Sequence, residues 1–246
     1  MTTVYLIRHG QTDTNIFDGI NGSASNQPLN ATGLAMAANL TPVFASVPLD
    51  AIYASDLIRA VQTAEGVRGT RDMEIRIEPN LQEMDFGLMD GMSGIEAKRA
   101  FPKEFRTWAR QPEKFHPPGS HEGWKDFQVR LVKAFLKIVR ENRGKRIAIV
   151  GHGAAFSVLT AKLLGLSLHD YRLAPMLSNG AYRVLQIEDD GHFFIDAFEH
   201  CEHLPKEWRL RRRHLRARSK RARKMPRRVF YAPLKMTEKE MKQYAD

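Results

Sequence analysis

Two histidines, each beside a glycine at the end of an apolar run, are the residues of this chain best placed to do chemistry. Residues 4–7 lead into Arg8-His9-Gly10, and residues 146–150 lead into Gly151-His152-Gly153. A neutral imidazole can attack phosphorus, and an arginine offers a planar fork of N–H groups to phosphate oxygens. Together the two segments could support phosphoryl chemistry. A strand-end histidine that bonds only to backbone is the structural alternative for His9.

The elements that must position these residues follow from the apolar pattern. Short runs rich in β-branched residues predict strands over 4–7, 50–54, 74–77 and 146–150. Apolar spacing predicts helices over about 31–46, 55–67, 121–142 and 154–164, and a hairpin over 180–187 and 192–198. This alternation is typical of an α/β fold, a three-layer sandwich with a mostly parallel central sheet and helices on both faces. Ligands bind such sheets beyond the carboxyl ends of the strands, where both histidines lie.

A second arginine is a candidate for the same site. Ser55 is a suitable N-cap, which places Arg59 about one turn into the next helix, where its side chain can point back over the strand end. A phosphate monoester carries negative charge that grows during attack, so its site needs fixed positive donors. Pairing with Asp56, three residues earlier, is the structural alternative for Arg59.

These segments give the chain a resemblance to the histidine phosphatase superfamily, the phosphoglycerate mutase-like enzymes, and more closely to its smaller phosphatase branch. The resemblance covers about residues 3–200 and is specific, because five separate segments match in the family's order. They are 6–12 with Asn15, Pro28-Leu29 with Gly33, 55–64, 81–87 and 151–153.

The resemblance implies roles residue by residue. His9 would be the nucleophile that carries the phosphoryl group, and Glu83 would be the proton donor, with Asp85 and Asp90 as neighbouring alternatives. The groups around the phosphoryl oxygens would be Arg8, Arg59 and His152, and further phosphate- or substrate-binding positions would be Gln11, Thr12, Asn15, Asn21, Gly22 and Gly153. Glu122 and Arg130 also match the family pattern, whereas Gly123 replaces a serine.

The positions of glycine and proline residues and the distribution of charge divide the chain into three parts. We expect a catalytic domain over 1–203, in which the segment 84–125, interrupted by Gly and Pro, covers the pocket, and a basic extension over 204–246. Residues 206–228 contain 13 lysines and arginines and one glutamate, whereas 1–205 contain 22 basic and 24 acidic residues. The net charge of +10 is therefore a property of the extension. It could bind a polyanion such as RNA or an acidic surface, pack on a second subunit in a homodimer, or be a solvated appendage.

The cysteine content and the apolar runs of the chain bear on its cellular compartment and on metal binding. The single cysteine, Cys201, excludes an internal disulfide framework, and the chain has no secretory signal and no run of about 18 apolar residues. We expect a cytoplasmic protein without a membrane span. The run 200–203, His-Cys-Glu-His, could be read as metal ligands, but it lacks the paired distant spacing of a zinc site. No metal or cofactor is predicted.

The function predicted from the sequence is a metal-independent phosphomonoesterase that acts on a small phosphorylated metabolite through a phosphohistidine on His9. A phosphoglycerate mutase is the alternative within the family. Mutases usually carry a longer segment between the acid and the second histidine, and here only 68 residues separate Glu83 from His152. The alternative from another class is a nucleic-acid- or polyanion-binding protein that acts through its basic tail.

Overall fold

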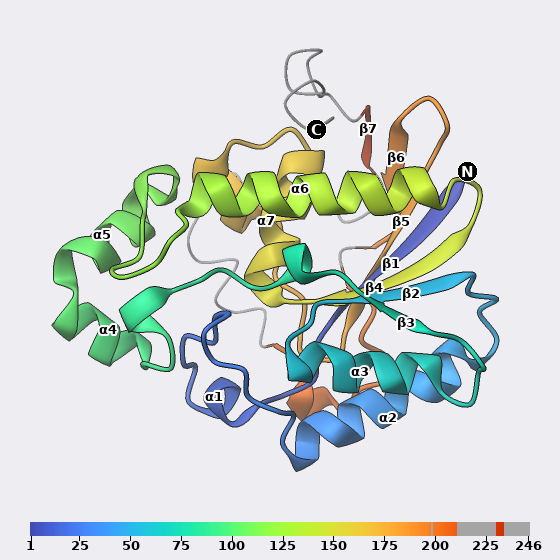
Figure 1. The fold of residues 1–246 in the computed structure, drawn as a ribbon, viewed down its shortest axis with the longest axis horizontal. Coiled ribbons are helices and arrows are strands. Elements are labelled where there is room, and N and C mark those ends of the chain that lie inside the picture. The colour runs from blue at the N-terminus through green and yellow to red at the C-terminus, as the bar shows by residue number, and fades with distance from the viewer. Residues whose placement is uncertain (198, 211–229, 234–246) are drawn as a thin grey trace.

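The computed structural model describes residues 1–197, 199–210 and 230–233, and these form a seven-stranded sheet with helices on both faces (Figure 1). The strands are β1 Thr2–Arg8, β2 Ala51–Ala54, β3 Ile75–Ile77, β4 Arg146–Gly151, β5 Tyr182–Ile187, β6 His192–Ile195 and β7 Phe230–Pro233. Their order across the sheet is β3-β2-β4-β1-β5-β6-β7. Strands β3, β2, β4 and β1 are parallel, and β5, β6 and β7 extend the sheet through antiparallel pairs. The α/β sandwich predicted from the sequence is confirmed, and the parallel part carries both histidines.

Alternating side chains on the strands bury two separate apolar layers. Leu6 of β1 belongs to a core that includes residues of α6 Trp124–Glu141 and α7 Gly153–Leu163. The next residue, Ile7, belongs to a core with α2 Ala31–Ala45 and α3 Ile58–Arg68. The two helix pairs lie on opposite sides of the sheet (Figure 1). Because strand residues alternate between faces, strands buried on both faces read as continuous apolar runs, as 4–7 and 147–150 do.

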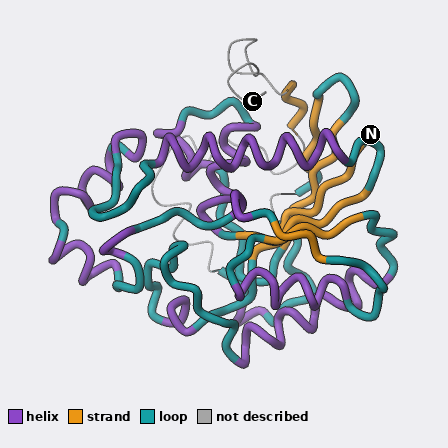
Figure 2. The backbone as a smooth tube through the Cα atoms, viewed as in Figure 1, coloured by secondary structure: helices purple, strands orange, loops and turns teal. Residues whose placement is uncertain are grey.

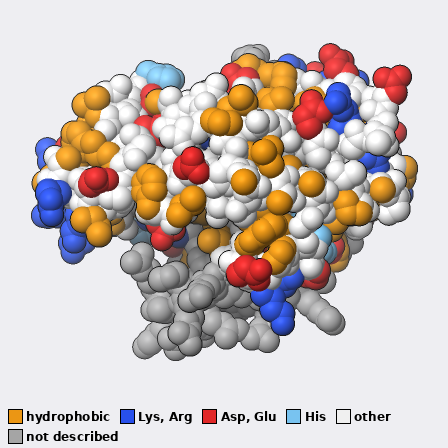
Figure 3. Space-filling view, turned by 90° about the horizontal axis from the view of Figure 1, so that it is seen from below, with side chains coloured by type: hydrophobic (Ala, Val, Ile, Leu, Met, Phe, Trp, Pro, Cys, Tyr) orange, Lys and Arg blue, Asp and Glu red, His pale blue; other side chains and the backbone are white. Residues whose placement is uncertain are grey.

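The segment 84–125 folds into short helices and turns beyond the carboxyl ends of the parallel strands (Figure 2). It contains the two short helices α4 Gly94–Ala100 and α5 Pro102–Arg110. A third apolar core lies beneath them, with Met84, Phe86, Met89, Phe115 and Trp124 all buried. These methionine and aromatic side chains therefore pack the interior of the segment. The outer surface at this end gathers lysine and arginine side chains (Figure 3), among them the exposed Lys98, Arg99, Lys103 and Arg106.

The helix predicted to begin at His121 begins at Trp124. Gly123 is its N-cap, and the Gly123 N–H donates to the Asp126 carboxylate at 3.0 Å. An acid in the first turn can satisfy a free N–H and lies favourably in the helix dipole. Asp126 therefore satisfies the N–H of the capping residue, the half of a capping box that needs no side chain at the N-cap.

Packing continues past residue 203. Leu204 is 1% exposed within the core that faces α6 and α7, and Trp208 packs against the same core. Arg209 donates from Nε to the Leu204 carbonyl at 2.9 Å. Most of the basic segment 206–228 lies outside the described residues. None of the helices in the described part of the chain is both long enough and apolar enough to span a bilayer.

Candidate active site

The two histidines meet at the carboxyl ends of β1 and β4. These strands are parallel neighbours with Arg8 opposite Gly151, and the His9 N–H donates to the Gly151 carbonyl at 2.9 Å. The imidazole ring centroids of His9 and His152 lie 5.3 Å apart, and the rings are 2% and 0% exposed. Adjacent parallel strands that end at the same level thus bring together residues 143 positions apart in the sequence.

Backbone contact fixes the tautomer of His9. Its Nδ1 lies 2.6 Å from the Gly10 carbonyl oxygen, which can only accept, so Nδ1 carries the proton and Nε2 keeps its lone pair. Burial lowers the pKa of His9 well below its usual value, and the positive charges of Arg59 and Arg8 lower it further. The ring is consequently neutral at pH 7, with an unprotonated nitrogen available as a nucleophile.

His152 is held differently. Neither ring nitrogen has a hydrogen-bond partner within the described residues, although the side chain is fully buried. Burial lowers its pKa well below the usual value, with further lowering by Arg59, His9 and Arg8. An unpaired polar group in the interior is costly, so this imidazole is suited to bond an oxygen brought in by a ligand.

Two arginines supply positive charge beside the histidines. Arg8 donates from Nη1 to the Leu177 carbonyl at 2.7 Å, and its Nε has no partner in the part of the chain that is described. Gly153 allows this placement, because a Cβ there would lie 3.0 Å from the Arg8 Nε. Burial lowers the pKa of Arg8 and of Arg59 to about 10, which leaves both guanidinium groups charged at neutral pH.

Arg59 lies in the first turn of α3 rather than one turn after a cap at Ser55. The helix begins at Ile58 with Leu57 as N-cap, and the Ser55 hydroxyl accepts from the Leu57 N–H at 3.3 Å. The predicted N-cap was therefore wrong, because Ser55 closes a local turn before the helix. Arg59 is fully buried and donates to the carbonyls of a loop over 21–25.

Glu83 occupies the N-terminus of α7, the helix that follows His152. Its two carboxylate oxygens accept from the N–H groups of Ala154 at 2.9 Å, Ala155 at 3.0 Å and Met84 at 3.1 Å. Burial raises the pKa of Glu83, and these hydrogen bonds with the charges of Arg59 and Arg8 offset only part of that rise. A raised pKa favours the protonated carboxyl group, which can give a proton to a leaving oxygen.

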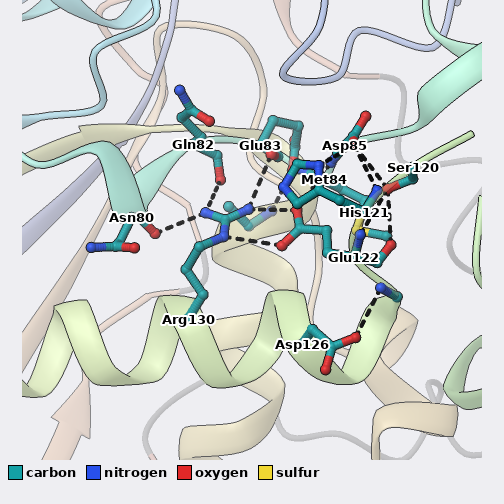
Figure 4. A network of polar contacts seen from close by, with 12 residues as sticks. Asn80, Gln82, Glu83, Met84, Asp85, Ser120, His121, Glu122, Asp126 and Arg130 are labelled. Atoms are coloured by element: carbon teal, nitrogen blue, oxygen red, sulfur yellow. Dashed lines mark hydrogen bonds and ion pairs between the residues drawn. The ribbon is translucent and has the colours of Figure 1, made fainter. Parts of the chain in front are cut away.

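The segment that carries Glu83 is held by a partly buried ion pair between Arg130 and Glu122 (Figure 4). Arg130 of α6 binds both carboxylate oxygens of Glu122, at 3.1 and 2.7 Å. The same guanidinium donates to the carbonyls of Asn80 at 2.9 Å, Gln82 at 3.1 Å and Glu83 at 3.4 Å. A bidentate pair of this kind fixes geometry as well as charge. Glu122 and Arg130 therefore hold the backbone of the candidate acid.

The alternative acids point elsewhere. Asp85 accepts from the Gly87 N–H, the Ser120 hydroxyl and the His121 ring. Asp90 accepts from backbone groups of the loop over 22–25. Of the three carboxylates, Glu83 is the one on which the charges of both Arg8 and Arg59 act.

The polar residues after His9 form a hydrogen-bonded chain. Thr12 caps α1 Asp13–Ile16, and Asn15 accepts from the Thr12 N–H at 3.1 Å. Asn21 donates to the Thr12 hydroxyl at 2.9 Å. Gln11 is not part of this chain: its side chain accepts from Asn30 at 3.2 Å, at the start of α2. Thr12, Asn15 and Asn21 thus lie together, and Gln11 supports a helix start.

Sequence reasoning missed Asn179. Its Nδ2 lies within hydrogen-bond distance of the carbonyls of His9 at 3.1 Å and Gly10 at 3.2 Å, and of the Asn15 side chain at 3.1 Å. The Asn-Gly turn before β5 predicts a turn but not a partner 170 residues away. Asn179 therefore belongs to the set of groups that hold the His9 backbone.

The described residues contain no group of three or more His, Cys, Asp and Glu side chains able to hold a metal ion. His200 contacts Asp196 at 3.0 Å and stacks on Tyr182, and His203 bonds to the Gly180 carbonyl at 2.9 Å. The two histidines of the 200–203 run thus have separate structural partners.

Two buried imidazoles, two guanidinium groups and a carboxyl group thus lie together beyond the ends of the parallel strands, an arrangement suited to bind a phosphate ester. The chain belongs to the histidine phosphatase superfamily (branch 1), whose family model matches residues 4–199.

Relatives of known name agree with this assignment. The chain is 29% identical to the adenosylcobalamin/alpha-ribazole phosphatase of Escherichia coli over 66% of this chain and 79% of that protein. It is 28% identical to a probable phosphoglycerate mutase of Enterobacter over 73% of this chain and 90% of that protein. The structure of an Entamoeba histolytica phosphoserine phosphatase variant with phosphoserine matches with a TM-score of 0.73 and 25% identity, covering 83% of this chain and 100% of that one. The chain is accordingly a phosphatase of this family, a hydrolase that cleaves phosphate esters.

Proposed function

We propose that this protein is a metal-independent phosphomonoesterase that hydrolyses a small phosphorylated metabolite through a phosphohistidine on His9. The observation that carries the proposal is the state of His9. It is buried and neutral, with Nδ1 held by the Gly10 carbonyl and Nε2 unprotonated beside two guanidinium groups. A nitrogen lone pair beside fixed cations suits attack on a phosphorus atom whose oxygens those cations bind.

The first step transfers the phosphoryl group to the protein. Arg8 and Arg59 bind the phosphate oxygens, and Nε2 of His9 forms the N–P bond as the P–O bond to the leaving group breaks. Glu83 in its protonated form gives its proton to the leaving oxygen, a role for which a raised pKa is suited. The substrate leaves as an alcohol, and Glu83 is left as a carboxylate on the N–H groups of α7.

The second step returns the protein to its starting state. The Glu83 carboxylate takes a proton from water, whose oxygen attacks phosphorus as the N–P bond breaks. His152 faces the same centre, and the negative charge of a bound phosphate raises the pKa of a neighbouring imidazole. We propose that His152 becomes protonated in the complex and donates to a phosphate oxygen.

A labelling experiment tests the intermediate. Wild-type protein, quenched during turnover of a labelled aryl phosphate in the presence of EDTA, is expected to carry one base-stable, acid-labile label on His9. The His9→Ala variant should release no phosphate and retain no label. Turnover by His9→Ala at the wild-type rate would reject the mechanism, and loss of wild-type turnover in EDTA would reject metal independence.

The identity of the substrate and the choice between hydrolysis and phosphoryl transfer back to substrate can be tested separately. The named relatives act on small phosphate esters, and a panel of phosphorylated metabolites that includes alpha-ribazole phosphate, phosphoserine, sugar phosphates and nucleotides will rank candidates for this chain. The short segment between Glu83 and His152 favours hydrolysis over mutase activity. Incubation with 3-phosphoglycerate and its bisphosphate decides this point, because isomer formation faster than phosphate release would indicate a mutase.

The charge of residues 206–228 supports a second proposal, polyanion binding in a cytoplasmic protein. RNA binding that weakens steeply between two salt concentrations, and that disappears on deletion of 206–228, is the expected result. A homodimer through this segment instead would show as a halved mass on deletion, without RNA binding.

A further inference from the structure

Asp90, in the segment 84–125, binds the loop of residues 22–25, which is far from it in the sequence. Its Oδ1 accepts from the Gly22 N–H at 2.8 Å and the Ser25 hydroxyl at 2.9 Å. Its Oδ2 accepts from the N–H groups of Ala24 at 3.0 Å and Ser25 at 3.2 Å. Four donors from one short loop thus converge on one carboxylate.

The same loop holds Arg59 from its other side. Arg59 donates from Nη1 to the Ser25 carbonyl at 2.6 Å and from Nη2 to the Gly22 carbonyl at 2.9 Å. Gly22 and Ser25 therefore each give an N–H to Asp90 and a carbonyl to Arg59. The loop thus lies between the Asp90 carboxylate and the Arg59 guanidinium. A change in its backbone conformation would break hydrogen bonds to one of these two groups.

Close packing removes the remaining freedom of this loop. A Cβ added at Gly22 would lie 2.6 Å from the Asp90 Oδ2 and 2.6 Å from the Met84 carbonyl oxygen. A shift of the loop away from Asp90 would withdraw two carbonyls from a guanidinium that is 0% exposed. A buried donor that loses its acceptor turns toward another, so the guanidinium would leave its orientation toward the histidines.

We infer that Asp90 is a positioning residue, which fixes the Arg59 guanidinium for phosphate binding through the backbone of residues 22–25. This inference rests on the proposed phosphate site, and it makes the segment 84–125 a part of that site. Asp90 contacts neither histidine; it acts through Arg59.

The direction in which Asp90→Asn changes the phosphate Kd distinguishes a positioning role of Asp90 from a purely electrostatic one. Removal of a negative charge near an anion site strengthens phosphate binding if charge alone matters. The Asp90→Asn variant offers the loop one acceptor oxygen and an NH₂ group that faces N–H donors, so the loop loosens. We expect its Kd for inorganic phosphate, measured by calorimetry, to rise about tenfold, the effect of one lost charge-assisted hydrogen bond.

Glu96→Gln is the matched control. Glu96 lies on α4 of the same segment and accepts from the Ser93 N–H in a capping box, a contact that glutamine preserves. This variant also removes one negative charge, and its phosphate Kd should stay within twofold of the wild-type value. The melting temperature of both variants, measured without phosphate, reports whether a change in Kd reflects loss of the folded state.

A double-mutant cycle tests the route through Arg59. In Arg59→Met, which keeps an unbranched apolar stem in the buried position, the further change Asp90→Asn should alter the phosphate Kd less than twofold. An equal tenfold loss in both backgrounds would overturn the inference, as would tighter phosphate binding by Asp90→Asn. If Arg59→Met does not fold, Arg59→Lys takes its place, with the same expected non-additivity.

The phosphate Kd of these variants can be measured whether or not the protein turns over a substrate. A protein that binds phosphate through Arg59 but forms no phosphohistidine would contradict the proposed function and leave the role of Asp90 intact. A protein that forms phosphohistidine, but whose phosphate affinity ignores Asp90, would leave the function intact and overturn this inference.

Discussion

Replacement of the candidate acid by its amide, Glu83→Gln, tests the chemistry most directly. Glu83 accepts three N–H donors, and its carboxyl is protonated more readily than usual because burial raises its pKa. Glutamine keeps the size of the side chain but has no acidic proton to give. Loss of a general acid costs about 10²- to 10⁴-fold in rate, or about 3–5 kcal/mol of transition-state stabilisation.

The size of the loss should depend on the leaving group. An alkoxide needs a proton as the P–O bond breaks, whereas p-nitrophenolate is stable without one. For Glu83→Gln, kcat/KM should therefore fall about 10²- to 10⁴-fold with an alkyl phosphate and less than about tenfold with p-nitrophenyl phosphate. The parameter kcat/KM is the right one, because it reports the first phosphoryl transfer and not the later hydrolysis.

Stability must be measured in parallel. The glutamine NH₂ group would face an N–H donor at the start of α7, which costs about 1–3 kcal/mol, while removal of a buried charge offsets part of this cost. Asp85→Asn is the control, because Asp85 is the neighbouring acid with partners outside the site. Equal losses for both substrates in Glu83→Gln, or a leaving-group effect of the same size in Asp85→Asn, would refute the assignment of the acid.

Three further predictions follow from burial and spacing. Gly153→Ala places a methyl group 3.0 Å from the Arg8 Nε, so KM for an aryl phosphate should rise while the melting temperature stays nearly constant. Burial holds the pKa of His152 well below its value in the unfolded chain, which is near 6.5. Below pH 6.5 the unfolded state therefore binds more protons than the folded state, and the free energy of unfolding decreases as the pH is lowered. Urea titrations should show wild-type protein losing up to about 1.4 kcal/mol per pH unit more than His152→Gln in that range, and parallel curves would contradict the inferred pKa. Leu204→Ala should lower the free energy of unfolding by about 2–5 kcal/mol, whereas Leu210→Ala, at a side chain 44% exposed, should change it by less than about 0.5 kcal/mol.

Residues that sit at strand ends were the most predictable part of the site. Apolar runs and the residues that follow them predict buried parallel strands, and the sheet then brings His9 and His152 together without further information. The family pattern singles out Glu83, and the structure places its carboxyl group at the start of the helix that follows His152, where both Arg8 and Arg59 act on its pKa. For the two histidines a local pattern carries the information, because each directly follows a strand whose direction fixes where the chain emerges.

Contacts between distant loops were not predictable. Asn179 reaches the His9 carbonyl and Asp90 reaches Gly22, and no local pattern in the sequence relates either pair. Ser55 is a case in which a local pattern was misleading. It is a good N-cap residue close to a helix, but its hydroxyl accepts from the Leu57 N–H in a turn before the helix. Gln11 lies in the most specific motif of the chain and yet supports α2. Motif membership alone therefore does not place a side chain in the site.

The two polar anchors of the segment 84–125 have a consequence for engineering. Asp90 secures its first part to the loop over 22–25, and Glu122 secures its last part to Arg130. The helices α4 and α5 lie between these anchors, over an apolar core that they share with α6 and α7. A chimera that exchanges 94–114 for the equivalent stretch of a relative, with both anchors kept, would show whether this stretch selects the substrate while the histidines and arginines of the candidate site stay in place.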